Sequence, residues 1–583
     1  MNKTYLYALV IISLLLSACE HRSSIPKTRT KEKMTTFCNP MDINYRFMVD
    51  SPSRREAADP TIIRFHDKYI LFASKSSGYW WSDDLSKWFF IENHDIPTED
   101  YAPTAIVMRD SVFFMASKRG TPNQVLKSAD PLSGKWEIAC QGIDQDVWDP
   151  AFFQDEDDKL YLYWGCSNKA PIYGVEIDPF TFRFKGKPVA LFNQNHTRLG
   201  WENIGDYNEK TNLSPYIEGA WLNKIGSKYY LQYAAPGTQY KSYCDGLYVS
   251  DHPLGTYKLA PHNPFSYKPG GFISGAGHSS TFQDNYGNYW HVATMSISVK
   301  HKFERRLGLF PAFVDKAGVF YTDTRFGDYP YQIPNHKIQS AQEISTNWMV
   351  LSEGKAITAS STDPTHPTNF ASDEDVRTYW AAQTGTPGEW IKMNLGKPMT
   401  VSAIQLNFAE HQSQILGRKE NLTHQYKVEG SLDNKQWEII ADRSNNQTDN
   451  THVYFELKVA TPYQYIRVTN LAVPDGCFAM SDLRLFGSSH QDQPASVKEF
   501  TAQRDKTDKK KVDLTWQEVD GACGYMINFG EKENQLYSHY RIKKKNHLSI
   551  RSLDAESNYC FTIEAYNESG ISDSSPIIRI TNK

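Results

Sequence analysis

The sequence has little of three things that would point to a simple function class: long hydrophobic runs, closely spaced cysteines and charge of one sign. Its apolar stretch near the N-terminus, residues 9–16, is too short for a retained membrane-spanning helix. The 63 basic and 67 acidic residues leave a net charge of −4, which argues against a nucleic-acid-binding protein. The eight cysteines show no CxxC spacing, so we expect no zinc site and no dense disulfide framework. Cys523 and Cys560 fall in one small terminal domain, where they could pair.

Aromatic residues are abundant instead. They make up 13% of the chain, with 14 tryptophans and 34 tyrosines. Strand-rich proteins use such residues in their cores, and sugar-binding sites stack sugar rings on them. A role in β-sheet cores accounts for most of them, and a few are left as candidates for sugar contacts.

One stretch, residues 216–234 (YIEGAWLNKIGSKYYLQYA), sets the pattern for the first half of the chain. Its aromatic and apolar runs are separated by a Gly-Ser turn, which is typical of a β-hairpin. The same phrase of opening residue, strand, turn and aromatic strand begins at Asp59, Ala102, Asp149 and His278. Repeats of ~40–50 residues with several strands each are typical of propeller blades, so five copies predict a five-bladed β-propeller.

The residues that open the repeats predict a shared site. The innermost strands of a propeller converge on its axis, so we expect the first side chain of each inner strand to face one funnel. The five openers are Asp59, Ala102, Asp149, Glu218 and His278. A single acid before a strand is usually a turn residue. Three carboxylates and an imidazole at one register of a repeat instead favour a catalytic pocket.

The N-terminus resembles a bacterial lipoprotein signal. Lys3 and the apolar run lead to the sequence LSAC at residues 16–19, which is similar to a lipobox. That resemblance implies cleavage before Cys19 and a lipid anchor on Cys19 in the bacterial outer membrane, facing the periplasm or the surface. An ordinary signal peptide with a chance cysteine is the alternative. We therefore expect a lipoprotein signal peptide over residues 1–19 and a flexible tether over residues 20–36.

Residues 37–335, which hold the five repeats, resemble glycoside hydrolase family 43, a family of five-bladed propellers. The resemblance rests on four triplets in repeat register: Ala58-Asp59-Pro60, Trp148-Asp149-Pro150, Ile217-Glu218-Gly219 and Gly277-His278-Ser279. It implies that Asp59 is the general base, that Glu218 is the general acid, and that Asp149 tunes the pKa of the acid and orients it. Inverting glycosidases hold such a base and acid ~6.5–9.5 Å apart, which leaves room for the attacking water.

The same resemblance implies further site residues. His278 is a candidate ligand of a calcium ion or its waters, although no cofactor is expected to be required. An arginine of the last blade, Arg305 or Arg306, is expected to contact the substrate or the acid. Trp148, beside the third opener, is a candidate for substrate binding. Thr104 stands where many family members carry an acid, and this departure leaves the sugar subsite open.

An insertion over residues 193–214 is the longest irregular part of the propeller segment. Long loops on a propeller face often shape a binding pocket. The candidate pocket residues in this loop are His196, Trp201, Glu202 and Asp206, and Trp201 is the one we expect to bind substrate. The alternative is that they are solvated loop residues.

Two β-sandwich domains are expected after the propeller. Residues 340–487 contain short alternating strands and resemble the discoidin or coagulation factor 5/8 type C domain, which is also met as a carbohydrate-binding module. Its candidate ligand-binding loop residues are Trp380, Glu410, His411 and Phe478, and a purely structural spacer is the alternative. Residues 493–583 resemble a fibronectin type III domain, with Trp516 and Tyr525 on early strands and Tyr559 and Tyr566 later, and we expect it to act in spacing or docking.

Taken together, these resemblances imply an all-β, monomeric glycoside hydrolase that acts on oligo- or polysaccharides. The expected reaction is exo-acting and inverting, with release of a terminal pentose from plant or algal polysaccharide, by β-xylosidase activity first and α-L-arabinofuranosidase activity second. Three alternatives stay open: β-galactosidase activity on galactan side chains, a non-catalytic glycan-binding protein, and a phosphorylase. The acid at Asp59 argues against a phosphorylase, which needs a cluster of basic residues in place of the base.

Overall fold

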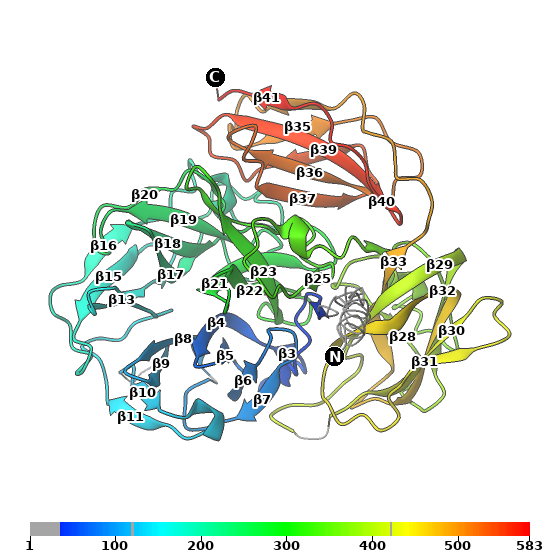
Figure 1. Ribbon diagram of the computed structural model, residues 1–583, viewed down its shortest axis with the longest axis horizontal. Helices are drawn as coiled ribbons and strands as arrows, with labels where there is room; N and C mark the ends of the chain where they lie inside the picture. The colour runs from blue at the N-terminus through cyan, green and yellow to red at the C-terminus, as the bar shows by residue number, and fades with distance from the viewer. Residues whose placement is uncertain (1–34, 99, 118–121, 420–421, 583) are drawn as a thin grey trace, which may run out of the picture. The chain divides into compact units, whose positions relative to one another are not determined.

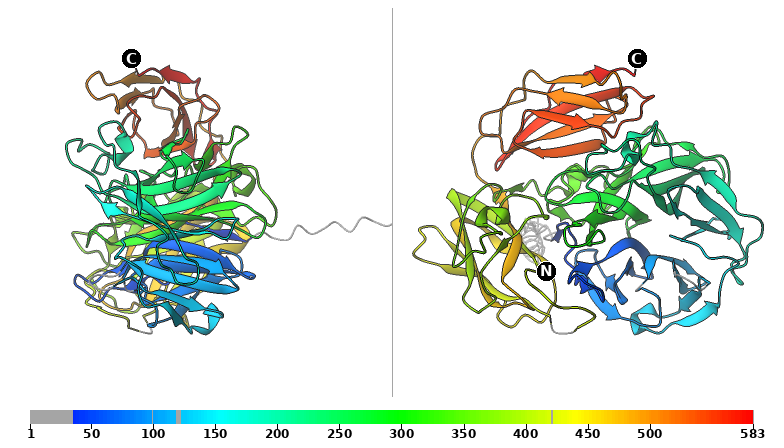
Figure 2. Two further views of the ribbon diagram at one scale, coloured as in Figure 1. Left: turned by 90° about the vertical axis from the view of Figure 1, so that its left-hand side faces the viewer. Right: turned by 180° about the vertical axis from the view of Figure 1, so that it is seen from behind.

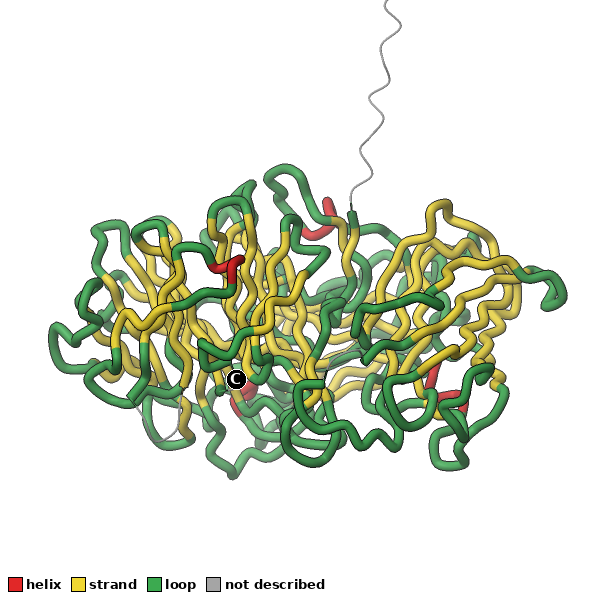
Figure 3. Tube along the Cα trace, turned by 90° about the horizontal axis from the view of Figure 1, so that it is seen from below, coloured by secondary structure: helices red, strands yellow, loops and turns green. Residues whose placement is uncertain are grey.

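The computed structural model describes residues 35–98, 100–117, 122–419 and 422–582, and its regular structure consists of strands apart from short 3-10 helices (Figure 3). The helices are η1 (Pro131–Ser133), η2 (Gly200–Glu202), η3 (Ala341–Ile344) and η4 (Thr368–Ala371). None of the described helices has the length and apolar character needed to cross a bilayer. The all-β class expected from the sequence is confirmed. Cys19 and the expected signal peptide lie outside the described residues.

The propeller has five blades of four antiparallel strands each, and a short parallel pairing joins the fourth blade to the fifth (Figure 1). From inner to outer strand, the first blade holds β4 (Ala58–Phe65), β5 (Lys68–Ser74), β6 (Gly78–Ser82) and β7 (Phe89–Glu92), and the second holds β8 (Tyr101–Met108), β9 (Ser111–Ser117), β10 (Val125–Ser128) and β11 (Glu137–Cys140). The third holds β12 (Ala151–Gln154), β13 (Leu160–Trp164), β15 (Ile172–Ile177) and β16 (Val189–Phe192). The fourth holds β17 (Ile217–Ile225), β18 (Lys228–Ala235), β19 (Cys244–Ser250) and β20 (Lys258–Leu259), and the fifth holds β21 (Ser274–Gln283), β22 (Tyr289–Ser296), β23 (Arg305–Val314) and β24 (Phe320–Thr322).

The inner strands close into a ring. Each of them contacts the inner strand of the next blade, and β21 of the last blade contacts β4 of the first. Apolar clusters fill the interfaces between blades, as one around Phe72 and Phe114 does between the first two. Shorter strands complete the segment: β1 (Thr36–Phe37) pairs with β25 (Tyr331–Gln332), β2 (Arg46–Phe47) pairs with β3 (Arg55–Glu56), and β14 (Cys166–Ser167) pairs with β17.

Hydrogen bonds between blades fix where each inner strand begins. The backbone N–H groups of Asp59, Ala102 and Asp149 each donate to a hydroxyl on the preceding blade, at distances of 2.8, 2.7 and 2.9 Å. The donor at Asp59 reaches Thr294 of the fifth blade, so the same bond also closes the ring. The N–H group of His278 donates in the same way to the carboxylate of Asp245, at 2.8 Å.

The opening residues share a left-handed backbone conformation. The φ angle is 52° at Asp59, 53° at Asp149 and 46° at His278, and in the fourth blade the equivalent value of 60° belongs to Gly219. Glu218 therefore lies one residue before the register of the other openers, so its placement at that register by the sequence analysis was wrong. A Cβ atom on Gly219 would come within 2.6 Å of the His278 ring, which explains why this opener has no side chain.

The first sandwich domain, yellow-green to yellow in Figure 2, contains two long strands. β29 (Trp390–Phe408) and β32 (His452–Ala472) pair along most of their length, and register shifts interrupt the pairing. The other strands are β26 (Met349–Val350), β27 (Ala356–Ala359), β28 (Trp380–Ala381), β30 (Gln425–Ser431), β31 (Glu438–Asp442) and β33 (Ala479–Ser488). Trp380 and Phe478 are fully buried in the core of this domain, so the structure does not support them as ligand-binding loop residues.

The second sandwich domain has two sheets around one core. The first sheet holds β34 (Thr501–Arg504), β35 (Val512–Thr515) and β38 (His547–Ile550), and the second holds β36 (Gly524–Gly530), β37 (Ser538–Lys543), β39 (Tyr559–Asn567), β40 (Gly570–Ile571) and β41 (Ile578–Ile580). Trp516 packs edge-on against Tyr525 in this core. Cys523 and Cys560 are free thiols, because they lie at opposite ends of the paired strands β36 and β39.

A buried ion network joins the propeller to both sandwiches. Asp328 of the propeller segment lies 3.0 Å from Lys268 and 3.4 Å from Arg541 of the second sandwich. Glu374 of the first sandwich lies 3.0 Å from the same Arg541 and 2.7 Å from Arg484. All five side chains are at most 5% exposed. Their charges therefore depend on one another for compensation.

Candidate active site

The structure brings four of the sequence-predicted residues together at the inner ends of the blades. Nδ1 of His278 lies 3.3 Å from Oδ1 of Asp59 and 3.8 Å from Oδ2 of Asp149. Burial lowers the pKa of His278, but the surrounding carboxylates, Asp59 first and then Asp149 and Glu218, outweigh it and raise that pKa above the usual value. The acidic pocket therefore favours the protonated form of His278, and calcium binding through His278 stays a prediction.

Two hydrogen-bond donors and a nearby imidazole hold Asp59 as a carboxylate. Arg305 donates to Oδ1 at 3.0 Å and the Ser74 hydroxyl donates to Oδ2 at 2.6 Å, while His278 faces Oδ1. Burial raises the pKa of Asp59, but these positive and donating groups outweigh burial and hold the pKa below the usual value. An ionised, buried carboxylate of this kind can accept a proton from a water molecule.

The two neighbouring arginines of β23 point in different directions. Arg305 binds Asp59 and Glu56, with 2.5 Å between its Nη2 atom and Oε1 of Glu56. Arg306 donates to Nε2 of His452 in the first sandwich at 2.9 Å, and it takes no part in the pocket. Alternation along a strand sends successive side chains to opposite faces, so only one of the pair could reach the site. Arg306 was therefore a wrong site prediction.

Asp149 and Glu218 form the other side of the pocket, with a thiol between them. The Cys166 thiol donates to Oε2 of Glu218 at 3.3 Å and also interacts with Asp149. Burial raises the pKa of Asp149 to about 7; His278 opposes this effect, whereas Glu218 and Asp59 add to it. The pocket therefore pairs an ionised Asp59 with a second carboxyl, Asp149, that keeps its proton up to neutral pH.

Glu218 is the second residue of β17 and is half-buried. The hydroxyl of Tyr243 donates to its Oε1 atom at 2.6 Å, and Cys166 occupies the other oxygen. The two contacts fix the orientation of the carboxyl group. Neither Tyr243 nor Cys166 lies in the repeat phrase, so the sequence offered no signal for them.

Asp245 is a second residue that sequence reasoning missed. It accepts hydrogen bonds from the backbone of His278 at 2.8 Å and from the Ser279 hydroxyl, and it is fully buried. Burial raises the pKa of Asp245 to about 7, while Ser279 and His278 oppose that effect. Asp245 thus fixes the backbone that carries His278. It lies on the third strand of its blade, outside the repeated phrase, where no spacing pattern marks it.

Comparison with protein families agrees with this geometry. Residues 53–311 match the family described as glycosyl hydrolases family 43, and residues 356–482 match the F5/8 type C domain. The propeller is a family 43 glycoside hydrolase domain. The first sandwich is accordingly an F5/8 type C domain, and carbohydrate is the class of ligand that both families imply. The fibronectin type III assignment of residues 493–583 stays a prediction.

Solved structures similar to this chain include family 43 enzymes. One described as a glycoside hydrolase is 16% identical, with a TM-score of 0.45, and the match covers 74% of this chain and 97% of that one. A thermostable family-43 glycoside hydrolase is 20% identical over 52% of this chain and 100% of its own, with a TM-score of 0.42. An endo-1,4-beta-xylanase from Bacteroides thetaiotaomicron is 21% identical over 48% and 96%, with a TM-score of 0.40. No curated protein matches the chain.

The insertion of the family 43 domain does not line the pocket. Trp201 is fully buried and packs in the core shared with the second sandwich, so its role in substrate binding was a wrong prediction. Glu202, also buried, accepts the Tyr233 hydroxyl at 2.6 Å. Asp206 pairs with Arg377 of the F5/8 type C domain at 2.7 Å. The remaining candidate, His196, accepts a hydrogen bond at its carbonyl from the second sandwich. The insertion therefore docks the domains onto one another.

Two further sequence-predicted positions have local roles. Trp148 is half-buried beside Asp149, and its carbonyl accepts a hydrogen bond from Gly165 at 2.9 Å; substrate binding by Trp148 stays a prediction. Thr104 is fully buried, and its hydroxyl accepts the backbone N–H of Phe152 on the next blade at 3.1 Å. Thr104 thus links two inner strands.

The F5/8 type C domain reaches the neighbourhood of Asp59. Arg418 of this domain donates to the carbonyl of Lys75 at 2.9 Å. The Lys75 ammonium lies 4.0 Å from the centre of the Tyr101 ring, and Tyr101 packs edge-on against Phe303, which Arg305 covers. Tyr101 and Phe303 are both half-buried. An aromatic pair next to the base is suited to stacking against a sugar ring.

Proposed function

We propose that the family 43 domain is an exo-acting, inverting glycoside hydrolase that releases a terminal pentose. β-Xylosidase activity is the first candidate and α-L-arabinofuranosidase activity the second. One observation carries the proposal: an ionised Asp59, held by Arg305 and His278, shares a buried pocket with Glu218 and with Asp149, whose pKa is raised to about 7. One group that takes a proton and one that gives a proton are what acetal hydrolysis requires.

The proposed reaction assigns each group one step. Asp59 removes a proton from a water molecule as the water oxygen bonds to the anomeric carbon. Glu218 gives its proton to the glycosidic oxygen as the bond between that oxygen and the anomeric carbon breaks. Asp149, whose pKa is raised to about 7, holds a proton beside Glu218, and Tyr243 and Cys166 hold the orientation of Glu218. The products are the free sugar, with inverted anomeric configuration, and the shortened alcohol.

Arg305 and His278 act on the base rather than on the leaving group. Both lie against Oδ1 of Asp59, so they keep it ionised before attack and oriented toward the water. The choice of a pentose rests on the family resemblance, and Tyr101 with Phe303 is the aromatic surface we assign to the sugar ring.

The experiment that tests the proposal combines substrates and anomers. Purified protein is assayed on nitrophenyl pentosides and hexosides, and NMR identifies the first anomer released. We expect turnover of a β-xyloside with inversion, and loss of at least ~10³-fold in kcat for Asp59→Ala and Glu218→Ala at a temperature where both variants are folded. Retention of configuration, phosphate-dependent turnover or binding without turnover would each reject the mechanism, whereas preference for a galactoside would reject the pentose only.

We also propose that Cys19 carries a lipid that holds the enzyme in the outer membrane. The support is the LSAC sequence at residues 16–19. Cells that express the wild-type chain should retain the activity in the outer-membrane fraction, and the Cys19→Ala chain should not. Equal distribution of both proteins between the fractions would rule out the anchor.

A further inference from the structure

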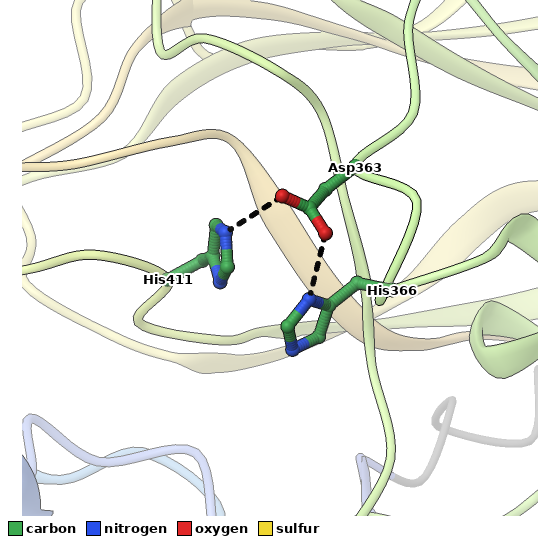
Figure 4. Close-up of side chains that lie close together, drawn as sticks. All are labelled: Asp363, His366 and His411. Atoms are coloured by element: carbon green, nitrogen blue, oxygen red, sulfur yellow. Dashed lines mark hydrogen bonds and ion pairs between the residues drawn. The ribbon is translucent and has the colours of Figure 1, made fainter.

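Three side chains that the proposed reaction does not use lie together in the F5/8 type C domain (Figure 4). Asp363 and His366 come from the loop after β27, and His411 comes from the loop after β29. Each offers one ligand atom, and these atoms all lie within 4.8 Å of one another. The Asp363 carboxylate lies between the two imidazoles, with one oxygen toward each ring (Figure 4).

His411 gives an independent reason to expect a ligand. The residue is 7% exposed, and its Nε2 atom has no hydrogen-bond partner among the described residues. That atom points at Oδ2 of Asp363 from 3.7 Å, which is too far for a hydrogen bond. The other ring nitrogen, Nδ1, lies 3.2 Å from the Tyr379 hydroxyl. A buried nitrogen without a partner is costly unless something fills the gap in front of it.

The three ligand atoms lie close to the spacing of a tetrahedral metal site. Bonds of ~2.0–2.2 Å from nitrogen and oxygen to zinc place neighbouring ligand atoms about 3.3–3.6 Å apart. The two imidazole nitrogens face different oxygens of Asp363: His366 Nδ1 lies 3.3 Å from Oδ1 and His411 Nε2 lies 3.7 Å from Oδ2. The three side chains would therefore have to shift slightly to share one ion. The Asp363 and His366 side chains are each 23% exposed, which leaves one side open to water. Two imidazoles with one carboxylate suit zinc, whereas calcium prefers oxygen ligands only.

We propose that Asp363, His366 and His411 bind a divalent transition-metal ion, zinc foremost, with water completing the coordination. Tyr379 fixes the His411 ring from its second nitrogen, as outer partners of metal-bound histidines do. His411 follows Glu410, whose carboxylate lies 2.8 Å from Arg55 of the family 43 domain. The ion would therefore stabilise the loop that carries His411, which already contacts the propeller through Glu410 and Arg55. The expectation of no zinc site rested on cysteine spacing, which carries no information about these ligands.

The test uses the full mature chain, stripped with a chelator and titrated with ZnCl₂ by calorimetry and with CoCl₂ by visible absorption. We expect one ion per chain and tetrahedral cobalt bands. His366→Ala, His411→Ala and Asp363→Asn should each weaken binding at least tenfold, and Tyr379→Phe about tenfold. His490→Ala removes an exposed histidine of the same part of the chain and should leave binding unchanged.

A second set of measurements separates this site from the catalytic pocket. Asp149, Cys166 and Glu218 form another group that could hold an ion, and Cys166→Ser would remove a thiolate band from the cobalt spectrum. Binding that survives His366→Ala and disappears with Cys166→Ser would overturn the proposal. Zinc should also raise the unfolding midpoint of the wild type but not that of His366→Ala. This comparison tests the site even if the His411→Ala variant, which changes a buried residue, fails to fold. Equal shifts in both proteins would overturn the proposal too, and neither readout depends on glycosidase activity.

Discussion

A Cβ atom added to Gly219 would lie 2.6 Å from Cγ of the His278 imidazole. Because Gly219 has no side chain, the His278 ring has room to lie between Asp59 and Asp149. This contact couples the backbone that follows Glu218 to the residue that faces the base.

Gly219→Ala should thus impair catalysis beyond its effect on stability. The φ angle of +60° and the clash with His278 both oppose a side chain, so we expect kcat to fall at least ~10-fold. Gly226→Ala is the matched control, because Gly226 has a φ of +59° in the same hairpin and nothing within 4 Å of the added atom. The control should lose about 1 kcal/mol of stability and keep full activity, and equal kinetic losses in the two variants would contradict the coupling.

Replacing Arg305 should shift the acid limb of the pH profile. Arg305 lowers the pKa of Asp59, so Arg305→Met should raise that pKa, and activity should already be lost at higher pH as the solution is acidified. The measurement is kcat/KM from pH 4 to pH 9. Arg306→Lys, at the adjacent residue that faces His452, should leave the limb in place. An unmoved acid limb in Arg305→Met would show that Asp59 is not the titrating base.

Asp149 should govern the alkaline limb. Because its pKa is raised to about 7, it carries a proton below neutral pH and loses the proton above it. Asp149→Asn mimics the neutral form, so we expect the alkaline limb to move to higher pH while kcat falls ~10²-fold or more. The exposed neighbour Asp146 is the control, and Asp146→Asn should keep the wild-type profile. A limb that stays near neutral pH in Asp149→Asn would assign it to another group.

A substitution at Trp201 distinguishes a role in the protein core from a role in substrate binding. Since Trp201 is fully buried against the second sandwich, Trp201→Ala should cost ~3–5 kcal/mol of stability. At a temperature where the variant is folded, its KM should equal that of the wild type. A raised KM without a lower unfolding midpoint would restore Trp201 to the sugar site.

The ion network at the domain junction should dominate acid stability. Asp328→Asn leaves the buried Lys268 and Arg541 without their shared carboxylate, at a cost of ~3–5 kcal/mol. Burial raises the pKa of Asp328, but Arg541 and Lys268 outweigh it and lower that pKa, so this stability is present at neutral pH and is lost as acidification protonates Asp328. Asp251→Asn, which breaks the exposed pair with Lys228, should leave the unfolding midpoint unchanged. Equal midpoints for both variants would contradict the network.

The sequence by itself determined the propeller and most of its acidic pocket. The hairpin phrase occurs five times, and radial symmetry converts equal positions in a repeat into neighbours around one axis. Asp59, Asp149 and His278 could be found in this way without any contact being known. The repeated phrase also led to Glu218, although the register of its blade differs by one residue.

Only the tertiary structure decided which side chains surround those residues. Arg305 and Arg306 are adjacent in sequence, and the pleat of β23 sends one to Asp59 and the other to His452. Tryptophan is a residue type that often contacts sugars, yet Trp201 is buried by packing against the second sandwich. Contacts of this kind join residues far apart in the chain and depend on how strands and domains pack, so no local pattern in the sequence encodes them.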